Sequence, residues 1–117
     1  MKTIVAGSRS ITNKEVVLRA VKESGFNITE VVSGRALGVD TLGEEIAKDM
    51  GLPVKPFPAN WGKYGPGAGF LRNSEMADYA EALIAVWDGD SPGTADMISK
   101  MGKRKKKIFI HKEKKNE

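Results

Sequence analysis

Apolar residues follow two spacings along the chain, and their alternation predicts a succession of strands and helices. Short apolar runs, typical of strands, occupy residues 2–6, 29–33, 53–57, 82–87 and 108–110. Between these runs, apolar residues recur at the spacing of a buried helix face. Helices are therefore expected after Thr12 up to Gly25, after Thr41 up to Gly51, over residues 70–80, and from Ser91 to Gly102.

The starts of the first two helices carry the pattern of a capping box. Thr12 is followed three positions later by Glu15, and Thr41 is followed three positions later by Glu44. In such a box, the two side chains accept hydrogen bonds from backbone amides that the helix leaves free. The pattern predicts that both helices begin at a threonine.

Strand–helix alternation is typical of an α/β domain. The runs Ile4-Val5-Ala6 and Leu83-Ile84-Ala85-Val86 contain no polar residue, as expected for strands that are buried on both faces. Right-handed crossovers favour a Rossmann-like, doubly wound, mainly parallel five-stranded sheet in a single domain. We assign residues 1–111 to this domain and residues 112–117 to a basic, frayed C-terminal tail.

Composition excludes several kinds of site. The 117 residues include no cysteine and one histidine, His111, so disulfide scaffolds, thiolate metal sites and cysteine nucleophiles are excluded. With a single histidine near the end of the chain, neither a serine–histidine–aspartate triad nor a multi-histidine metal site is expected. No metal and no cofactor is expected. No apolar run is long enough to span a membrane or to form a signal peptide, so we expect a cytoplasmic protein without membrane association.

The net charge of +4 is concentrated near the C-terminus. Residues 101–117 hold 8 of the 19 basic residues and 2 of the 15 acidic ones. Five of these basic residues are consecutive, from Lys103 to Lys107. Two interpretations remain open: a solvated turn that raises solubility, or a surface that binds single-stranded nucleic acid.

The residues best suited to bind a ligand follow the predicted strands. In an open parallel sheet, ligands bind outside the carboxyl ends of the strands, near the point where the strand order reverses. Each of the first four strands leads through a glycine-containing loop toward a helix N-terminus, whose free amides attract phosphate. The candidates are Gly7, Ser8, Arg9, Ser33, Gly34, Ala36, Gly38, Asp40, Trp61, Arg72, Asn73, Asp88, Gly89, Ser91, Gly93 and Thr94.

Several candidates have a structural alternative. Gly7 and Gly34 suit tight turns as well as close ligand contact, and Asp40 suits helix capping. Trp61 can anchor its long glycine- and proline-rich loop or stack on a base. Arg72 is expected at a helix start, where a cation opposes the helix dipole, and this placement favours a ligand role.

Four sequence blocks are specific as a set. They are Gly7-Ser8-Arg9, Ser33-Gly34-x-Ala36-x-Gly38-Val39-Asp40, Arg72-Asn73-x-x-Met76 and Asp88-Gly89-x-Ser91-x-Gly93-Thr94, with Ala59-x-Trp61 between the second and third. From Ile4 to about Ile110, the chain resembles the YspA/YpsA-related branch of the SLOG (SMF/DprA–LOG) superfamily. The resemblance implies a Rossmann-like domain that binds a nucleotide or nucleotide-derived ligand, often ADP-ribose-like, and that forms homodimers in many members.

The LOG relatives are phosphoribohydrolases, which split nucleoside monophosphates into base and ribose phosphate. Their motifs look like Arg-Lys-x-x-Met and Gly-Gly-x-Gly-Thr-x-x-Glu. Here Asn73 stands at the position of the lysine and Met97 at that of the final glutamate. Methionine can neither stabilise a cationic ribosyl transition state nor orient water. Glu75 and Asp88 are the remaining candidates for a catalytic carboxylate.

We therefore expect a protein that binds or senses a nucleotide-like ligand, in preference to an enzyme. Backbone amides of Gly7-Ser8, Ser33-Gly34 and Gly93-Thr94 are expected to hold phosphates, and Arg9 and Arg72 to neutralise charge. Asp40 or Asp88 is expected to bind ribose hydroxyls, and Trp61 to cover the base.

Two alternatives remain: a nucleotide N-glycosidase of the LOG type, and binding of single-stranded nucleic acid by analogy with DprA. The expected partners are a nucleotide-like small molecule and further copies of this chain.

Overall fold

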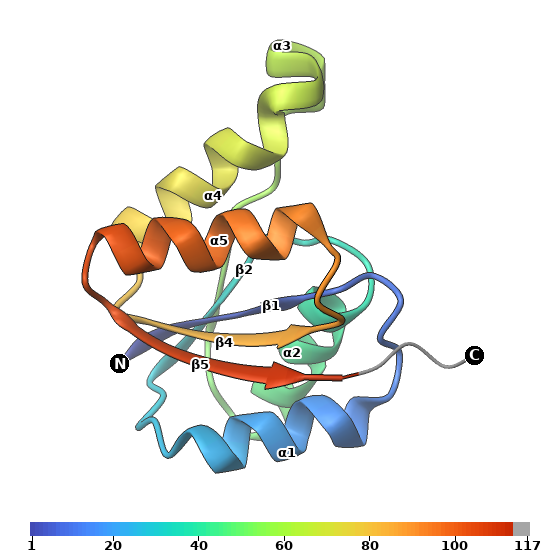
Figure 1. Ribbon diagram of the computed structural model, residues 1–117. Coiled ribbons are helices and arrows are strands. Elements are labelled where there is room, and N and C mark those ends of the chain that lie inside the picture. Colours follow the sequence, from blue (N-terminus) through green and yellow to red (C-terminus); the bar gives the residue numbers. More distant parts are fainter. Residues whose placement is uncertain (114–117) are drawn as a thin grey trace.

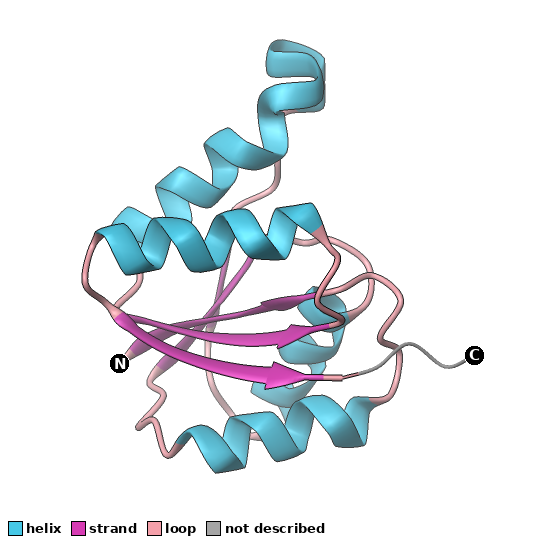
Figure 2. Cartoon of the chain, in the orientation of Figure 1, coloured by secondary structure: helices cyan, strands magenta, loops and turns pink. Residues whose placement is uncertain are grey.

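The computed structural model describes residues 1–113 and contains one sheet with helices on both faces (Figures 1 and 2). The strands are β1 (Lys2–Gly7), β2 (Glu30–Ser33), β3 (Val54–Pro56), β4 (Ala82–Trp87) and β5 (Lys107–Lys112). The helices are α1 (Lys14–Ser24), α2 (Val39–Asp49), α3 (Trp61–Tyr64), α4 (Ala68–Tyr79) and α5 (Pro92–Lys103), with a 3₁₀ turn, η1 (Gly65–Gly67), between α3 and α4.

All five strands are parallel, in the order β3-β2-β1-β4-β5. The chain moves outward from β1 through β2 to β3, and then returns to place β4 on the other side of β1. The strand order therefore reverses between β1 and β4, where Gly7 pairs with Val86 at the carboxyl ends. This confirms the predicted Rossmann-like sheet and places the expected binding edge at this point.

Each face of the sheet has its own apolar core. Val5 and Ile84 pack with α1 and α2 on one face, whereas Ile4 and Leu83 pack with α4 and α5 on the other. Because neighbouring residues of a strand point to opposite faces, the uninterrupted apolar runs supply both cores. Strand β4, between β1 and β5, is buried from Ala82 to Val86.

The predicted capping boxes are wrong. The Asn13 side chain, instead of Thr12, accepts the amide of Glu15 and caps α1. Helix α2 already begins at Val39, so Thr41 lies inside its first turn, where its hydroxyl donates to the carbonyl of Ala36. In α1 a neighbouring polar side chain takes the capping position, whereas α2 begins at a glycine cap, Gly38, that has no side chain to accept an amide.

Residues 58–69, expected to be irregular, contain α3 and η1, and α4 begins at Ala68 instead of Phe70. Helix α3 and turn η1 form an arm that stands away from the sheet, beyond the start of α4 (Figure 1). Arg72 therefore lies in the second turn of α4 and not at its start. The helix dipole falls off within the first turn, so the dipole argument for a ligand role at Arg72 does not hold.

The C-terminal part of the chain is more ordered than predicted up to residue 113. Strand β5 extends to Lys112, and the amide of Glu113 donates to the carbonyl of Trp87. The predicted frayed tail otherwise lies at residues 114–117, outside the described residues. Within residues 1–113, no helix combines the length and apolar character needed to cross a bilayer.

Candidate functional site

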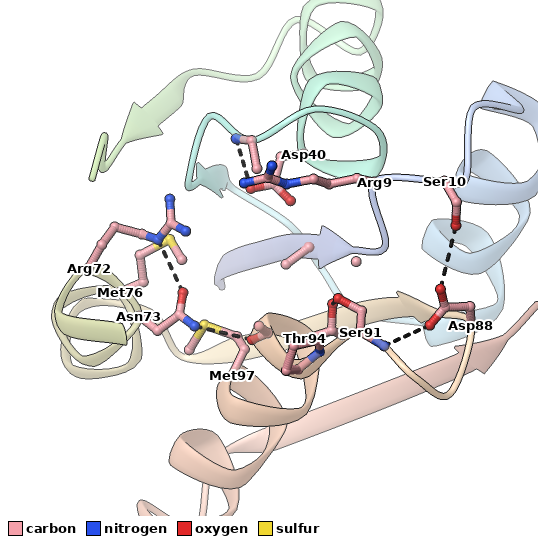
Figure 3. Close-up of a pocket in the computed structure, with 15 residues that line it drawn as sticks. Arg9, Ser10, Asp40, Arg72, Asn73, Met76, Asp88, Ser91, Thr94 and Met97 are labelled. Carbon is pink, nitrogen blue, oxygen red and sulfur yellow. Dashed lines mark hydrogen bonds between the residues drawn. The ribbon is translucent and has the colours of Figure 1, made fainter. Parts of the chain in front are cut away.

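A cavity of about 450 Å³ opens at the carboxyl edge of the sheet, where the strand order reverses (Figure 3). The end of β1, the start of α2, one face of α4 and the loop from β4 into α5 all border it. It is lined by Ala6, Gly7, Arg9, Ser10, Ala36, Asp40, Arg72, Asn73, Met76, Asp88, Ser91, Pro92, Gly93, Thr94 and Met97. The segments that sequence reasoning expected to meet at one edge therefore do meet there.

The N-terminus of α5 forms one wall of the cavity. Ser91 has extended backbone and Pro92 occupies the first helical turn, but no side chain of the described residues 1–113 caps the helix. The Thr94 hydroxyl is 3.3 Å from that of Ser91, so both hydroxyls lie together at the helix start. Since the first amides of a helix have no partners within it, this wall presents hydrogen-bond donors and positive potential.

Asp88 holds the loop that leads into α5. One carboxylate oxygen accepts the amides of Asp90 at 2.8 Å and Ser91 at 2.9 Å. The amide of Asp88 donates to the buried Ser8 hydroxyl at 3.0 Å, which ties this loop to the end of β1. Ser10 extends toward the second carboxylate oxygen of Asp88 at 3.5 Å. Asp88 and Ser8 therefore shape the cavity, and Asp88 also lines it.

Arg72 reaches from α4 to the loop after β2. Its Nη1 donates to the carbonyl of Gly34, and its Nε donates to Asn73 at 3.1 Å. A Cβ at Gly34 would lie only 2.7 Å from this Nη1, so the guanidinium group can pack against the backbone here only because residue 34 is a glycine. Burial lowers the pKa of Arg72, and the charge of Arg9 contributes in the same direction while Asp40 opposes it. Two arginines and two aspartates, Asp40 and Asp88, therefore line the same cavity.

Asn73 joins the two helices that face the cavity. Its side-chain nitrogen donates to the carbonyl of Gly93 at 3.2 Å and to Asp96 at 3.0 Å. Its side-chain oxygen accepts from Arg72, so the amide group is engaged at both ends. Asn73 thus fixes the position of Arg72 relative to the N-terminus of α5.

Asp40 is 5% exposed and lies against the same loop. Burial raises its pKa to about 6, although hydrogen bonds from the backbone of Ala36, Gly7 and Gly34 and the charge of Arg72 act in the opposite direction. A buried carboxyl group therefore sits beside the cavity and changes its charge close to neutral pH.

Other candidates serve the turns that build the cavity. Buried Ser33 donates to Glu44 at 2.6 Å and accepts the amide of Arg35. Gly38 has a φ of 77°, and a Cβ there would lie 2.6 Å from the carbonyl oxygen of Ser8. A Cβ at Gly7 would lie 1.9 Å from the carbonyl oxygen of Val86. These positions need their residues for close backbone packing, whatever binds in the cavity.

Trp61 lies apart from this cavity, in an adjoining one of about 240 Å³. That second cavity is lined by Arg9, Gly34, Arg35, Ala36, Leu37, Pro58, Ala59, Trp61 and Arg72. The structure thus distributes the predicted binding residues over two neighbouring spaces instead of one.

Glu75 does not belong to either cavity. It is exposed on α4 and is absent from the lining of both, so the structure does not bring it together with the other candidate residues. Gly89, with a φ of 93°, also lies outside both linings and serves the turn after β4. Gly89 shows that membership in a sequence block does not ensure contact with a cavity.

Sequence reasoning missed five residues of the first cavity: Ala6, Ser10, Met76, Pro92 and Met97. Ser10 directly follows Arg9, and its loop position was a usable signal. The two methionines are 1% exposed and belong to a helix–sheet core. Their apolar spacing indicated core packing but not that their side chains also form the floor of a cavity.

Among residues 1–113, no cluster of three or more acidic or histidine side chains is arranged to hold a metal ion. Comparisons of the chain with models of protein families, with curated proteins and with solved structures found no match.

Proposed function

We propose that this protein binds a nucleotide or nucleotide-derived ligand in the first cavity, through its phosphates. The observation that carries the proposal is that two arginines, Arg9 and Arg72, line one cavity with the N-terminus of α5, where Ser91 makes no side-chain capping hydrogen bond. Both features attract anions, and arginine can bind a phosphate through two parallel hydrogen bonds. A space of about 450 Å³ is within the range of small-molecule sites.

The remaining polar groups suit a sugar next to the phosphate. Asp88 and Asp40 present carboxyl oxygens, and Ser91 and Thr94 present hydroxyls. These groups can exchange hydrogen bonds with ribose hydroxyls. An ADP-ribose-like ligand, bound by a cytoplasmic sensor, is the form of the proposal that the family resemblance supports.

Hydrolysis of an N-glycosidic bond is the second candidate function, because Asp88 supplies a carboxylate that lines the cavity. Two observations favour binding without turnover. The Asp88 carboxylate already accepts two backbone amides, and Met97 lines the cavity where the LOG pattern has glutamate.

The basic cluster gives less support to nucleic-acid binding. Arg104 pairs with Asp78 at 2.8 Å, and Lys106 donates to the carbonyl groups of Ala77, Asp78 and Ala80 at the end of α4. Two of the five basic residues from Lys103 to Lys107 therefore stabilise the fold. Homodimer formation is a separate proposal, tested by the molar mass of the protein in solution.

The binding proposal is tested by thermal unfolding with ADP-ribose, AMP and ribose 5-phosphate. A ligand at 100 times its dissociation constant adds about 2.7 kcal/mol of stability. For a domain of this size the melting temperature should rise by about 10 °C. Adenosine and ribose, which lack phosphate, are the controls and should give little change. If no phosphate compound raises the melting temperature, the proposal is wrong; release of base or ribose phosphate would favour the hydrolase instead.

A Gly34→Ala variant tests the position of Arg72. The new Cβ would lie 2.7 Å from Nη1 of Arg72 and 3.0 Å from Oδ2 of Asp40, so the guanidinium group must move. We expect about tenfold weaker binding of ADP-ribose in calorimetry, the loss of roughly one charged hydrogen bond. Gly102→Ala is the matched control, because its Cβ meets no atom within 4 Å. Equal affinities of the two variants would contradict the assigned role of Arg72.

A further inference from the structure

The second cavity has a lining of one charge. This cavity of about 240 Å³ is bordered by Arg9, Arg35 and Arg72, and among residues 1–113 no acidic residue contributes to its lining. The first cavity, by contrast, also contains Asp40 and Asp88. Arg35 adopts a φ of 60°, which is uncommon for a residue with a side chain, and it lies directly after Gly34. Arg35 also lies 3.8 Å from Glu44, so Arg9 and Arg72 are the cations of this lining for which the structure shows no ion pair within residues 1–113.

The two cavities meet at an arginine pair. Arg9, Ala36 and Arg72 line both of them. Arg72 uses Nε and Nη1 for Asn73 and Gly34, and no described residue forms a hydrogen bond with its Nη2. Arg9 is exposed, and within residues 1–113 its guanidinium has neither a hydrogen bond nor an ion pair. Donors that the fold does not use are thus available where one cavity passes into the other.

An aromatic side chain borders the second cavity next to these donors. Trp61 is 53% exposed, although an indole is among the most costly side chains to leave in water. The place of a Cβ at Gly69 is 3.4 Å from the indole ring and 3.7 Å from Nη2 of Arg72. The indole and the guanidinium group therefore both lie next to Gly69. An exposed aromatic ring beside arginine is suited to stack on a nucleobase.

We propose that the second cavity is a binding subsite for an aromatic ring, so that the ligand extends through both cavities with its phosphates between Arg9 and Arg72. This inference rests on the proposed function and narrows it to compounds of the dinucleotide or nucleoside-diphosphate class. A mononucleotide has one ring, one sugar and one phosphate, and so it lacks the second sugar that would extend into the other cavity. A ligand with a ring, a diphosphate and a second sugar contacts all three features.

The test compares ADP-ribose with ribose 5-phosphate by calorimetry on the full chain. Ribose 5-phosphate has no aromatic ring and reports on the first cavity alone. In Trp61→Ala, we expect the affinity for ADP-ribose to fall about tenfold, the usual effect of one lost stacking contact, and that for ribose 5-phosphate to stay unchanged. Trp61→Phe should restore most of the affinity, because it restores an aromatic face.

Tyr64→Ala is the matched control, since Tyr64 is also an exposed aromatic residue of α3, at 46%, but lines neither cavity. It should bind both compounds as the unchanged protein does. The inference is overturned if Trp61→Ala binds ADP-ribose normally, or if it weakens both compounds equally, which would indicate a change in the arm. Binding of ribose 5-phosphate with no gain for ADP-ribose would overturn this inference alone. Failure of both compounds to bind the unchanged protein would overturn the proposed function as well.

Discussion

Replacement of Arg72 by methionine is expected to weaken the binding of ADP-ribose about a hundredfold. Methionine keeps the apolar part of the side chain and removes the guanidinium group that lines both cavities. Loss of one partner of a partly buried charge pair generally costs about 2–5 kcal/mol, because the remaining charge stays without compensation. A loss of about 2.7 kcal/mol corresponds to a hundredfold change in the dissociation constant.

The geometry around Arg72 indicates that a positive charge alone at this position is not enough for full ligand affinity. The guanidinium group is held by the carbonyl of Gly34 and the side chain of Asn73. Lysine has the charge but not the planar arrangement of donors, so it cannot hold both partners and a phosphate together. We therefore expect Arg72→Lys to recover only part of the affinity.

Isothermal titration of the two Arg72 variants measures these effects. Arg19→Met is the control, because Arg19 is exposed on α1, which borders neither cavity. If Arg72→Met binds as tightly as Arg19→Met, the ligand does not use the arginine pair, and the proposed site is wrong.

The fold could be predicted from the sequence because its strongest signals are local. Strand β4 runs from Ala82 to Trp87, as the apolar run predicts, since all of Ala82–Val86 is buried. The edge that holds the cavity then follows from strand order, because the carboxyl ends of parallel strands lie on one side. The helix starts were harder to predict: Asn13 and Thr12 are both plausible caps, and the choice depends on backbone angles.

The site was predictable as a set of loops but not as a set of contacts. Arg72 and Gly34 are 38 positions apart, and nothing in the sequence near either residue indicates that the guanidinium group donates to this carbonyl. Asp40 was expected to bind ribose or to cap a helix, whereas its burial and its altered pKa depend on amides from separate loops. Trp61 was assigned to the same site as the phosphate loops, because a sequence does not show how one edge is divided into two cavities.

The buried carboxyl group of Asp40 should make stability fall as the pH rises. The pKa of Asp40 is about 6 in the folded chain, against the ordinary value of 3.8. Between these values the folded protein holds a proton that the unfolded chain has released. The stabilising contribution of the protonated group is thus complete below about pH 4 and is lost as the pH passes 6. The difference corresponds to about 3 kcal/mol in the free energy of unfolding.

Asp40→Asn isolates this contribution from the other carboxyl groups that titrate in the same range. Asparagine keeps an oxygen that can accept the backbone amides but carries no charge at any pH. Chemical denaturation between pH 4 and 7.5 should show the unchanged protein losing about 2.5 kcal/mol relative to the variant. Parallel profiles for the two proteins would show that Asp40 does not titrate in this range.

The same carboxyl group should make anion binding stronger at lower pH. A bound phosphate adds negative charge beside Asp40 and raises its pKa further, so binding takes up a proton between about pH 6 and 7. ADP-ribose is a suitable probe, because its diphosphate does not change protonation there. We expect its affinity to rise severalfold from pH 7.5 to pH 5.5 in the unchanged protein and to stay nearly constant in Asp40→Asn. An equal rise in both proteins would assign the effect to another group, whereas a rise confined to the unchanged protein would place the phosphate beside Asp40.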